Sequence, residues 1–279
     1  MIGFDFDYYK PNSIEEAQKA YKDLKSQGKV AIYYSGGTEI ISKARVNQIH
    51  FDAIIDIKGI PECSIYGFKE DKLIIGAATT LTQISDSAFF PLLSQSCRNT
   101  ADHTARDKIT IGGNICGKII YKEPLLPLLL SDGEAVISDG EGVKSVPLTQ
   151  IFDKELQLEE GEFLIQITIN KEYIFLPYIN IKKTKQGKVD YPLVTVASIK
   201  KDNKIRIAFS GLCSYPFRLY EIEDNQNNIN NEIKIEFNNI MDFLPSPIME
   251  DILGTAEYRK FVTRNTLDEA LEKLGGVLC

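Results

Sequence analysis

Two short stretches of the chain contain the residues best suited to bind a ligand through the main chain. Residues 109–114 (Ile-Thr-Ile-Gly-Gly-Asn) and residues 32–40 (Ile-Tyr-Tyr-Ser-Gly-Gly-Thr-Glu-Ile) each run from strand-forming residues into a glycine pair. Glycine has no Cβ, so it accepts positive φ angles and lets a ligand come close to backbone N–H groups. Two such turns would hold a diphosphate from two sides, as backbone nests do. Either turn alone is more typical of a hairpin or a bulge.

A helix and a strand are predicted before the first turn. Ser13 and Glu16 form a capping box, apolar residues follow at helical spacing, and Gly28 is placed to end the helix. Residues 29–34 are a largely apolar run, which predicts a strand buried on both faces. The turn of residues 35–38 would then lie at the carboxyl end of this strand, where ligands bind on open α/β sheets.

The spacing around the first turn excludes the two commonest nucleotide-binding motifs. A dinucleotide-binding GxGxxG motif should open a long helix, whereas residues 40–45 allow only a short one. A phosphate-binding GxxxxGK[ST] motif occurs nowhere in the chain.

The composition argues against nucleic acid and membrane partners. The chain of 279 residues has a formal net charge of −7 and a sequence pI near 5.1, whereas both partners require a basic face. No apolar run approaches the roughly 20 residues of a membrane span, and residues 1–7 lack the basic region of a signal peptide. We therefore predict a cytoplasmic protein.

The five cysteines are scattered and odd in number, which predicts reduced and mostly buried thiols. The sequence contains no CxxC motif and only two histidines, so it offers no ligand set for a zinc ion or an iron–sulfur cluster of its own. Cys116, two residues after the second turn, is predicted to be a packing thiol rather than a residue that lines a site.

The rest of the pattern predicts an α+β protein. Paired strand-like runs separated by turn residues indicate antiparallel hairpins, at residues 63–77, 135–147 and 194–211. Residues 125–130 are strongly apolar and are expected to form a buried helix. Arg218 is expected at the surface.

A boundary is predicted near Lys171, where the basic strand of residues 178–185 begins a new run of elements. We expect two domains, residues 1–170 (with subdomains of about 1–56 and 57–170) and residues 171–279.

Four motifs occur in an order and at a spacing that resemble a known family. They are, in chain order, residues 35–39, 75–81, 110–114 and 251–260. Together they resemble the FAD-binding (medium) subunit of the molybdenum hydroxylases, the xanthine dehydrogenase family, over nearly the whole chain. The resemblance implies a two-part FAD-binding domain of the vanillyl-alcohol-oxidase (PCMH) type, followed by a small C-terminal domain with an antiparallel sheet and helices.

The resemblance assigns both turns to the diphosphate of FAD. Main-chain N–H groups and hydroxyls would supply the field, so that neither turn needs a basic residue. The residues implied are Ile32, Tyr33, Tyr34, Ser35, Gly36, Gly37, Thr38 and Glu39 in the first loop, and Thr110, Ile111, Gly112, Gly113 and Asn114 in the second.

Three further residues are implied by the resemblance, each with an alternative. Glu123 stands about where relatives carry an acid, but residues 115–124 depart from the family pattern, and a solvated acid is the alternative. Leu164 would pack on the isoalloxazine, or be an ordinary core leucine. Lys182 would approach the flavin, where a cation tunes cofactor electronics, or flank a solvated loop.

The function implied is electron transfer, with no catalytic acid or base in this chain. FAD carries one or two electrons, so it can join [2Fe–2S] clusters of a small subunit to NAD+ or another acceptor, while a molybdopterin-binding large subunit oxidises the substrate. One alternative is a non-catalytic assembly subunit that has lost tight FAD binding. Another is a stand-alone flavoprotein oxidase, against which the two histidines and the short C-terminal domain argue.

Overall fold

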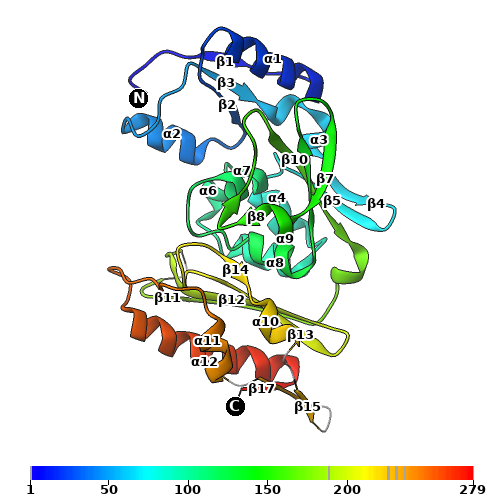
Figure 1. The fold of residues 1–279 in the computed structure, drawn as a ribbon, viewed down its shortest axis with the longest axis vertical. Helices are drawn as coiled ribbons and strands as arrows, with labels where there is room; N and C mark the ends of the chain where they lie inside the picture. The colour runs from blue at the N-terminus through cyan, green and yellow to red at the C-terminus, as the bar shows by residue number, and fades with distance from the viewer. Residues whose placement is uncertain (1, 188, 225–226, 230–231, 236, 279) are drawn as a thin grey trace. The chain divides into compact units, whose positions relative to one another are not determined.

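The computed structural model describes residues 2–278 apart from 188, 225–226, 230–231 and 236. The chain forms two compact units (Figure 1). The first contains residues 1–86, 102–119 and 133–170, and the second contains residues 87–101, 120–132 and 171–279. The predicted first domain, residues 1–170, includes residues 87–101 and 120–132, which the structure groups with the second unit. The domain boundaries stay a prediction.

A three-stranded parallel sheet opens the first unit, in the order β1-β3-β2. Its elements are β1 (Asp7–Tyr9), α1 (Ile14–Ser26), β2 (Ala31–Tyr34), α2 (Thr38–Arg45) and β3 (Ala53–Asp56). The predicted capping box of α1 is confirmed, since the Ser13 side chain accepts from the N–H of Glu16. The prediction that the first strand is buried on both faces is wrong: β2 is an edge strand and half-buried, whereas the central β3 is fully buried.

A five-stranded antiparallel sheet forms the rest of the first unit, in the order β4-β5-β10-β6-β7. Its strands are β4 (Tyr66–Lys69), β5 (Lys72–Gly76), β6 (Glu134–Ser138), β7 (Val143–Pro147) and β10 (Phe163–Asn170). Short elements connect them: η1 (Ile57–Gly59), α3 (Pro61–Ser64), α4 (Leu81–Ser87), α6 (His103–Arg106), α7 (Ile111–Cys116), α9 (Leu148–Ile151), β8 (Phe152–Asp153) and β9 (Glu155–Leu156). The hairpins predicted from the turn residues are confirmed.

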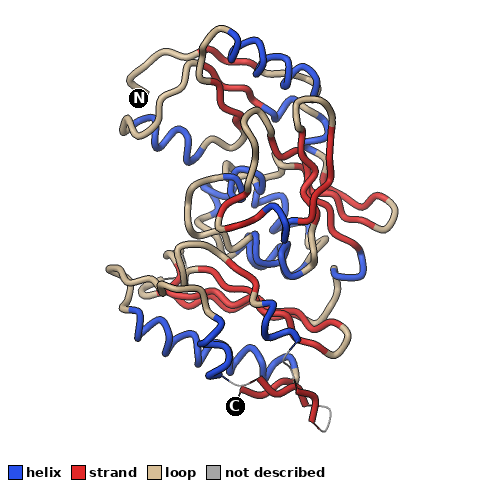
Figure 2. Tube along the Cα trace, viewed as in Figure 1, coloured by secondary structure: helices blue, strands red, loops and turns tan. Residues whose placement is uncertain are grey.

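The second unit is built on a four-stranded antiparallel sheet in sequence order, β11 (Tyr178–Thr184), β12 (Pro192–Lys201), β13 (Lys204–Ser210) and β14 (Phe217–Arg218). The long helix α12 (Ala256–Leu274) lies on one side of this sheet and the leucine-rich α8 (Leu125–Leu130) on the other (Figure 1). Figure 2 shows the strands of this sheet in red beside the helices in blue. The remaining elements are α5 (Pro91–Arg98), η2 (Lys171–Tyr173), α10 (Tyr220–Asp224), β15 (Asn227–Ile229), β16 (Glu232–Ile235), α11 (Phe237–Phe243) and β17 (Gly276–Leu278). The predicted α+β class is confirmed.

Two predictions about single side chains are wrong. Arg218 is buried, because its guanidinium donates to the Glu223 and Asp132 carboxylates and to the carbonyl of Leu129, which together satisfy the charge. Cys116 is exposed at the end of α7 and is not a packing thiol. The other described cysteines, Cys63, Cys97 and Cys213, are buried as predicted, and Cys279 lies outside the described residues.

In the part of the chain that the structure describes, no helix combines the length and the apolar character needed to cross a bilayer.

Candidate functional site

The two glycine turns lie against each other in the first unit, as the sequence predicts. A Cβ added to Gly36 would stand 2.0 Å from the carbonyl oxygen of Lys108 and 3.1 Å from the backbone nitrogen of Thr110. Such distances are far below any real Cβ contact, so the turns approach this closely only because position 36 is glycine. The residue that follows, Gly37, has φ +71, and a Cβ there would meet the Tyr34 ring at 2.2 Å.

The first turn leaves backbone donors uncommitted. Gly37 is the N-cap of α2, and no side chain caps this helix. Within the described residues, no protein acceptor takes the N–H groups of residues 36–40. Uncapped N–H groups at a helix start carry partial positive charge and favour an anion. The first turn can therefore donate to a phosphate, which is the role the sequence predicts for it.

The second turn differs from its prediction. Residues 111–116 form the short helix α7, and Gly112 and Gly113 are helical rather than at positive φ. Its N–H groups are already used: those of Ile111 and Gly112 donate to the carbonyls of Thr79 and Ala77, and that of Gly113 donates to Thr110 Oγ1. The expectation that backbone N–H groups of this turn bind phosphate is therefore wrong for these three. Gly112 is required instead for close packing, since a Cβ there would lie 2.6 Å from that of Ala77.

Each turn contributes a buried polar atom without a partner. Ser35 Oγ in the first turn and Asn114 Oδ1 in the second have no hydrogen-bond partner among the described residues. An unsatisfied buried polar group costs about 1–3 kcal/mol, so a polar ligand that bonds to both would be favoured. Thr79 Oγ1 is in the same condition, and its residue is 2% exposed beside α7. Thr79 is not among the predicted site residues, although it lies within the motif of residues 75–81.

A lysine that the sequence analysis missed stands at the first turn. Lys58 Nζ donates to the carbonyl of Ser35 at 2.8 Å and lies 4.5 Å from the centre of the Tyr34 ring. The carboxylate of Asp56 holds this ammonium at 2.8 Å. Lys58 comes from η1, directly after β3, which is the neighbour of β2 in the parallel sheet. Because parallel neighbours end at the same edge of a sheet, the residues after β3 lie beside the turn after β2.

The side chains before the first turn belong to the core of the first unit. Ile32 packs against the apolar cluster around Phe51. The Tyr33 ring stacks on Tyr21 at 5.4 Å, its hydroxyl donates to the carbonyl of Gly161, and burial raises its pKa. Leu164 is 2% exposed in β10. Its predicted contact with the flavin stays a prediction.

Glu123 and Lys182 lie together in the second unit. Lys182 Nζ is 3.2 Å from Glu123 Oε1, and the two side chains are 8% and 4% exposed. The ammonium also donates to the carbonyl of Asn99 at 2.9 Å. The solvated alternatives for these two residues are therefore wrong, since the structure buries both and pairs them.

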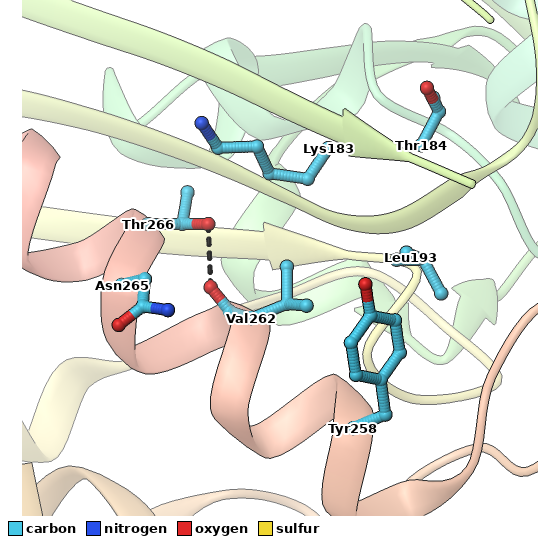
Figure 3. Close-up of a pocket in the computed structure, with 7 residues that line it drawn as sticks. All are labelled: Lys183, Thr184, Leu193, Tyr258, Val262, Asn265 and Thr266. Atoms are coloured by element: carbon cyan, nitrogen blue, oxygen red, sulfur yellow. Dashed lines mark hydrogen bonds between the residues drawn. The ribbon is translucent and has the colours of Figure 1, made fainter. Parts of the chain in front are cut away.

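A separate hollow of about 290 Å³ lies in the second unit between α12 and the edge of its sheet (Figure 3). Two of its polar side chains have protein partners: Lys183 Nζ is 2.9 Å from Glu269, and the Thr266 hydroxyl donates to the carbonyl of Val262. It is lined by Lys183, Thr184, Leu193, Tyr258, Val262, Asn265 and Thr266. None of the predicted site residues lines it.

Comparison with known proteins gives one matching family and several curated relatives. The family described as "FAD binding domain in molybdopterin dehydrogenase" matches residues 4–171. The xanthine dehydrogenase FAD-binding subunit of Escherichia coli O157:H7 is 23% identical, covering 99% of each chain. The nicotinate dehydrogenase FAD-subunit of Eubacterium barkeri is 26% identical, over 60% of this chain and 59% of that subunit.

Solved structures share the fold. A chain of carbon monoxide dehydrogenase from Hydrogenophaga pseudoflava superposes with a TM-score of 0.83 at 22% identity, covering 98% of both chains. A chain of quinoline 2-oxidoreductase from Pseudomonas putida 86 gives a TM-score of 0.81 at 19% identity, covering 98% of this chain and 99% of that one.

Proposed function

The chain belongs to the family of FAD-binding domains of molybdopterin dehydrogenases, and from this premise we propose that it passes electrons from [2Fe–2S] clusters of a partner subunit to NAD+ or another acceptor. The coarser function follows from the family: the chain is the FAD subunit of a molybdenum hydroxylase-type dehydrogenase, an oxidoreductase.

The contact between the two glycine turns carries this proposal. It places the uncommitted N–H groups of residues 36–40 beside the second turn. Each turn also carries one unpaired polar side chain, Ser35 in the first and Asn114 in the second. Lys58 adds a positive charge at the carbonyl of Ser35. The N–H donors, the unpaired Ser35 hydroxyl and the Lys58 cation fit the diphosphate of FAD. Asn114 Oδ1 only accepts, so it would suit a hydroxyl of the cofactor rather than its phosphates.

The residues of this chain bind and orient the cofactor. Bound FAD supplies the chemistry that links one-electron carriers to a hydride acceptor. The N–H groups at the start of α2 would hold a phosphate, and Gly36 lets the second turn lie against the first. In the second unit, Glu123 holds Lys182, whose buried charge would favour negative charge on the flavin. No side chain is required to move a proton.

The partners proposed are a molybdopterin-binding large subunit and a [2Fe–2S] small subunit. Relatives are named as the FAD-subunit or the medium chain of dehydrogenases, which supports an assembly of several chains. The described residues include no group of three His, Cys, Asp or Glu side chains that could hold a metal ion. In this proposal the metal centres of the reaction belong to the partner chains.

The absorption spectrum of the purified chain tests the proposal. We expect flavin bands near those of FAD, or their appearance after FAD is added and excess removed. Anaerobic addition of NADH should then bleach these bands if NAD+ is the acceptor. A chain that neither contains nor takes up flavin would contradict the proposal and leave the assembly subunit as its function. Co-purification with larger, metal-containing chains distinguishes a subunit from a stand-alone oxidase.

A further inference from the structure

Glu39 joins the first glycine turn to the segment that follows the second. Its two carboxylate oxygens each accept from the backbone N–H of Lys118 at 3.0 Å, and Oε2 also accepts from that of Ile119 at 3.3 Å. The ammonium of Lys43, one helical turn along α2, pairs with the same carboxylate. We call this set of bonds to Lys118 and Ile119 the carboxylate bridge.

The positions of Glu39 and Gly117 in the sequence make the carboxylate bridge possible. Glu39 is in the first turn of α2, two residues after the glycine pair, and residues 117–119 directly follow α7. A Cβ at Gly117 would lie 2.5 Å from Glu39 Oε2, so this glycine gives the carboxylate its place. Burial disfavours the charge of Glu39, but the hydrogen bonds from Lys43, Lys118 and Ile119 outweigh it and lower its pKa.

The chemistry of the carboxylate argues against direct contact with the diphosphate. A carboxylate has no proton to donate, and its charge repels phosphate oxygens. Both Glu39 oxygens are, moreover, already engaged by three donors of the protein.

We propose that Glu39 is a positioning residue for FAD, whose carboxylate bridge fixes the distance between the two glycine turns. This inference rests on the proposed function and changes the role of Glu39 within it, from a cofactor contact to a support. The bridge is made of protein groups alone, and it joins the first turn to the segment that follows the second. Its loss should therefore weaken FAD binding while leaving the phosphate donors themselves in place.

The test compares Glu39→Gln with Glu16→Gln. Both residues lie in the first turn of a helix and accept a backbone N–H, but Glu16 serves α1, where it bonds to Asn12. An amide has one acceptor oxygen, so Gln at position 39 turns an NH2 group toward the donors that the carboxylate engages. Two quantities are measured: the FAD dissociation constant from flavin fluorescence, and amide hydrogen exchange of residues 117–121 in the FAD-free protein.

We expect Glu39→Gln to raise the dissociation constant by about tenfold, the effect of losing one charge-assisted hydrogen bond, and to speed exchange at Lys118 and Ile119. Glu16→Gln should change neither quantity. Exchange that stays slow in Glu39→Gln, or exchange that speeds up while FAD affinity stays the same, overturns the inference. A wild-type protein that binds no FAD contradicts the proposed function itself. This result is distinct from failure of the inference, which is judged by comparing the variants with a wild type that does bind FAD.

Gly117→Ala tests the bridge from its other end, and serves if Glu39→Gln fails to fold. The added methyl group would displace Glu39 Oε2 without removing its charge, and it would also press on the carbonyl oxygen of Gly113 in the second turn, 2.9 Å away. The φ angle of position 117 is one that alanine accepts. We expect the same two changes in the same direction. A Gly117→Ala protein with wild-type exchange and wild-type FAD affinity overturns the inference.

Discussion

At the scale of single residues, acidic side chains hold lysines or backbone N–H groups near the predicted site residues of each unit. Asp56 holds Lys58 at the first turn, Glu39 holds the segment after the second, and Glu123 holds Lys182 in the second unit. Each carboxylate accepts from more than one donor or pairs with a lysine. Charged hydrogen bonds of this kind are stronger than neutral ones, and they fix direction as well as distance. Removing one of them should therefore alter geometry as well as stability.

Gly36→Ala should separate the two glycine turns. The new methyl group would meet the carbonyl oxygen of Lys108 at 2.0 Å, and backbone atoms cannot rotate away as a side chain can. We expect FAD affinity to fall by about tenfold or more, measured by fluorescence titration. Gly142→Ala is the matched control, because its added Cβ would meet no described atom within 4 Å beyond its own chain neighbours and its φ is not positive. A Gly36→Ala protein that binds FAD like the wild type would contradict the contact between the turns.

Lys182→Met should destabilise the second unit by leaving Glu123 buried without its cation. Breaking a buried ion pair from one side costs about 3 kcal/mol, which urea unfolding can measure. The control is Lys273→Met, which removes an exposed pair with Glu269 and should cost less than about 0.5 kcal/mol. Combining Lys182→Met with Glu123→Gln should recover part of the loss, since no charge is then buried alone. Equal losses of unfolding free energy in Lys182→Met and Lys273→Met would argue that the buried pair contributes no more to stability than the exposed one.

At the scale of elements, the site depends on how neighbouring strands and helices end. Asp56 ends β3 and accepts from Tyr8 of β1 at 2.6 Å and from the N–H of Lys58 in η1 at 3.0 Å. Its side chain is 3% exposed. One carboxylate thus connects two strands of the parallel sheet to the lysine at the first turn. The hydrogen bond to Asp56 also raises the pKa of Tyr8 to about 12.

Asp56 should make the stability of the first unit depend on acid pH. Burial raises the pKa of its carboxyl, but the bonds from Lys58 and Tyr8 outweigh this and lower it below the ordinary 3.8. A carboxyl group whose pKa is lower in the folded protein than in the unfolded chain contributes stability. This contribution is complete above the pKa of the unfolded chain and is lost as the pH falls through the pKa of the folded protein. Asp56→Asn should therefore cost about 2 kcal/mol at neutral pH, the worth of a charged hydrogen bond.

The difference in unfolding free energy between the wild type and Asp56→Asn should narrow below about pH 4, because the Asp56 carboxylate of the wild type becomes protonated there. Urea midpoints at neutral pH and on acidification measure both effects. A difference that stays constant across this range would show that the charge of Asp56 does not stabilise the fold.

Features that depend on neighbours in sequence were predictable, and features that depend on distant partners were not. The capping box at Ser13, the hairpins and the glycine of the first turn follow from local rules, and the structure has them. Lys58 was missed because its place depends on the pairing of β2 with β3. Arg218 was misplaced because Asp132, a partner that buries its charge, is far away in sequence.

The second glycine pair was misjudged for a related reason. A Gly-Gly step suggests positive φ, but here Ala77 approaches so closely that glycine is needed for space alone, and the backbone stays helical. The sequence therefore predicted that the turns meet, but not which of them keeps its donors for a ligand.

At the scale of the whole molecule, the chain passes several times between the two units. Residues 87–101 and 120–132 belong to the second unit, although the sequence around them builds the first. They carry α5 and α8, and the leucines of α8 are 0–4% exposed. Arg206 and Arg218 donate to the carbonyls of Leu130 and Leu129, which ties the end of α8 to β13 and β14. The second unit therefore has a part of its core supplied from far upstream.

A fragment of residues 171–279 tests the predicted domain boundary. We expect it not to unfold cooperatively in urea, because the apolar surface that α8 covers on β12–β14 would be exposed to water. Adding residues 1–170 as a separate fragment should restore a cooperative transition by supplying α5 and α8. Cooperative unfolding of residues 171–279 alone would instead support a boundary at residue 170.

The position of α8 in the chain has a consequence for synthesis on the ribosome. Its leucines emerge from the ribosome before any strand of the sheet that covers them. The nascent chain therefore exposes an apolar segment until β13 and β14 have been synthesised. Apolar segments that are transiently exposed in this way aggregate or bind chaperones. Slow translation between α8 and β14 should therefore lower the yield of folded protein more than the same delay after α12.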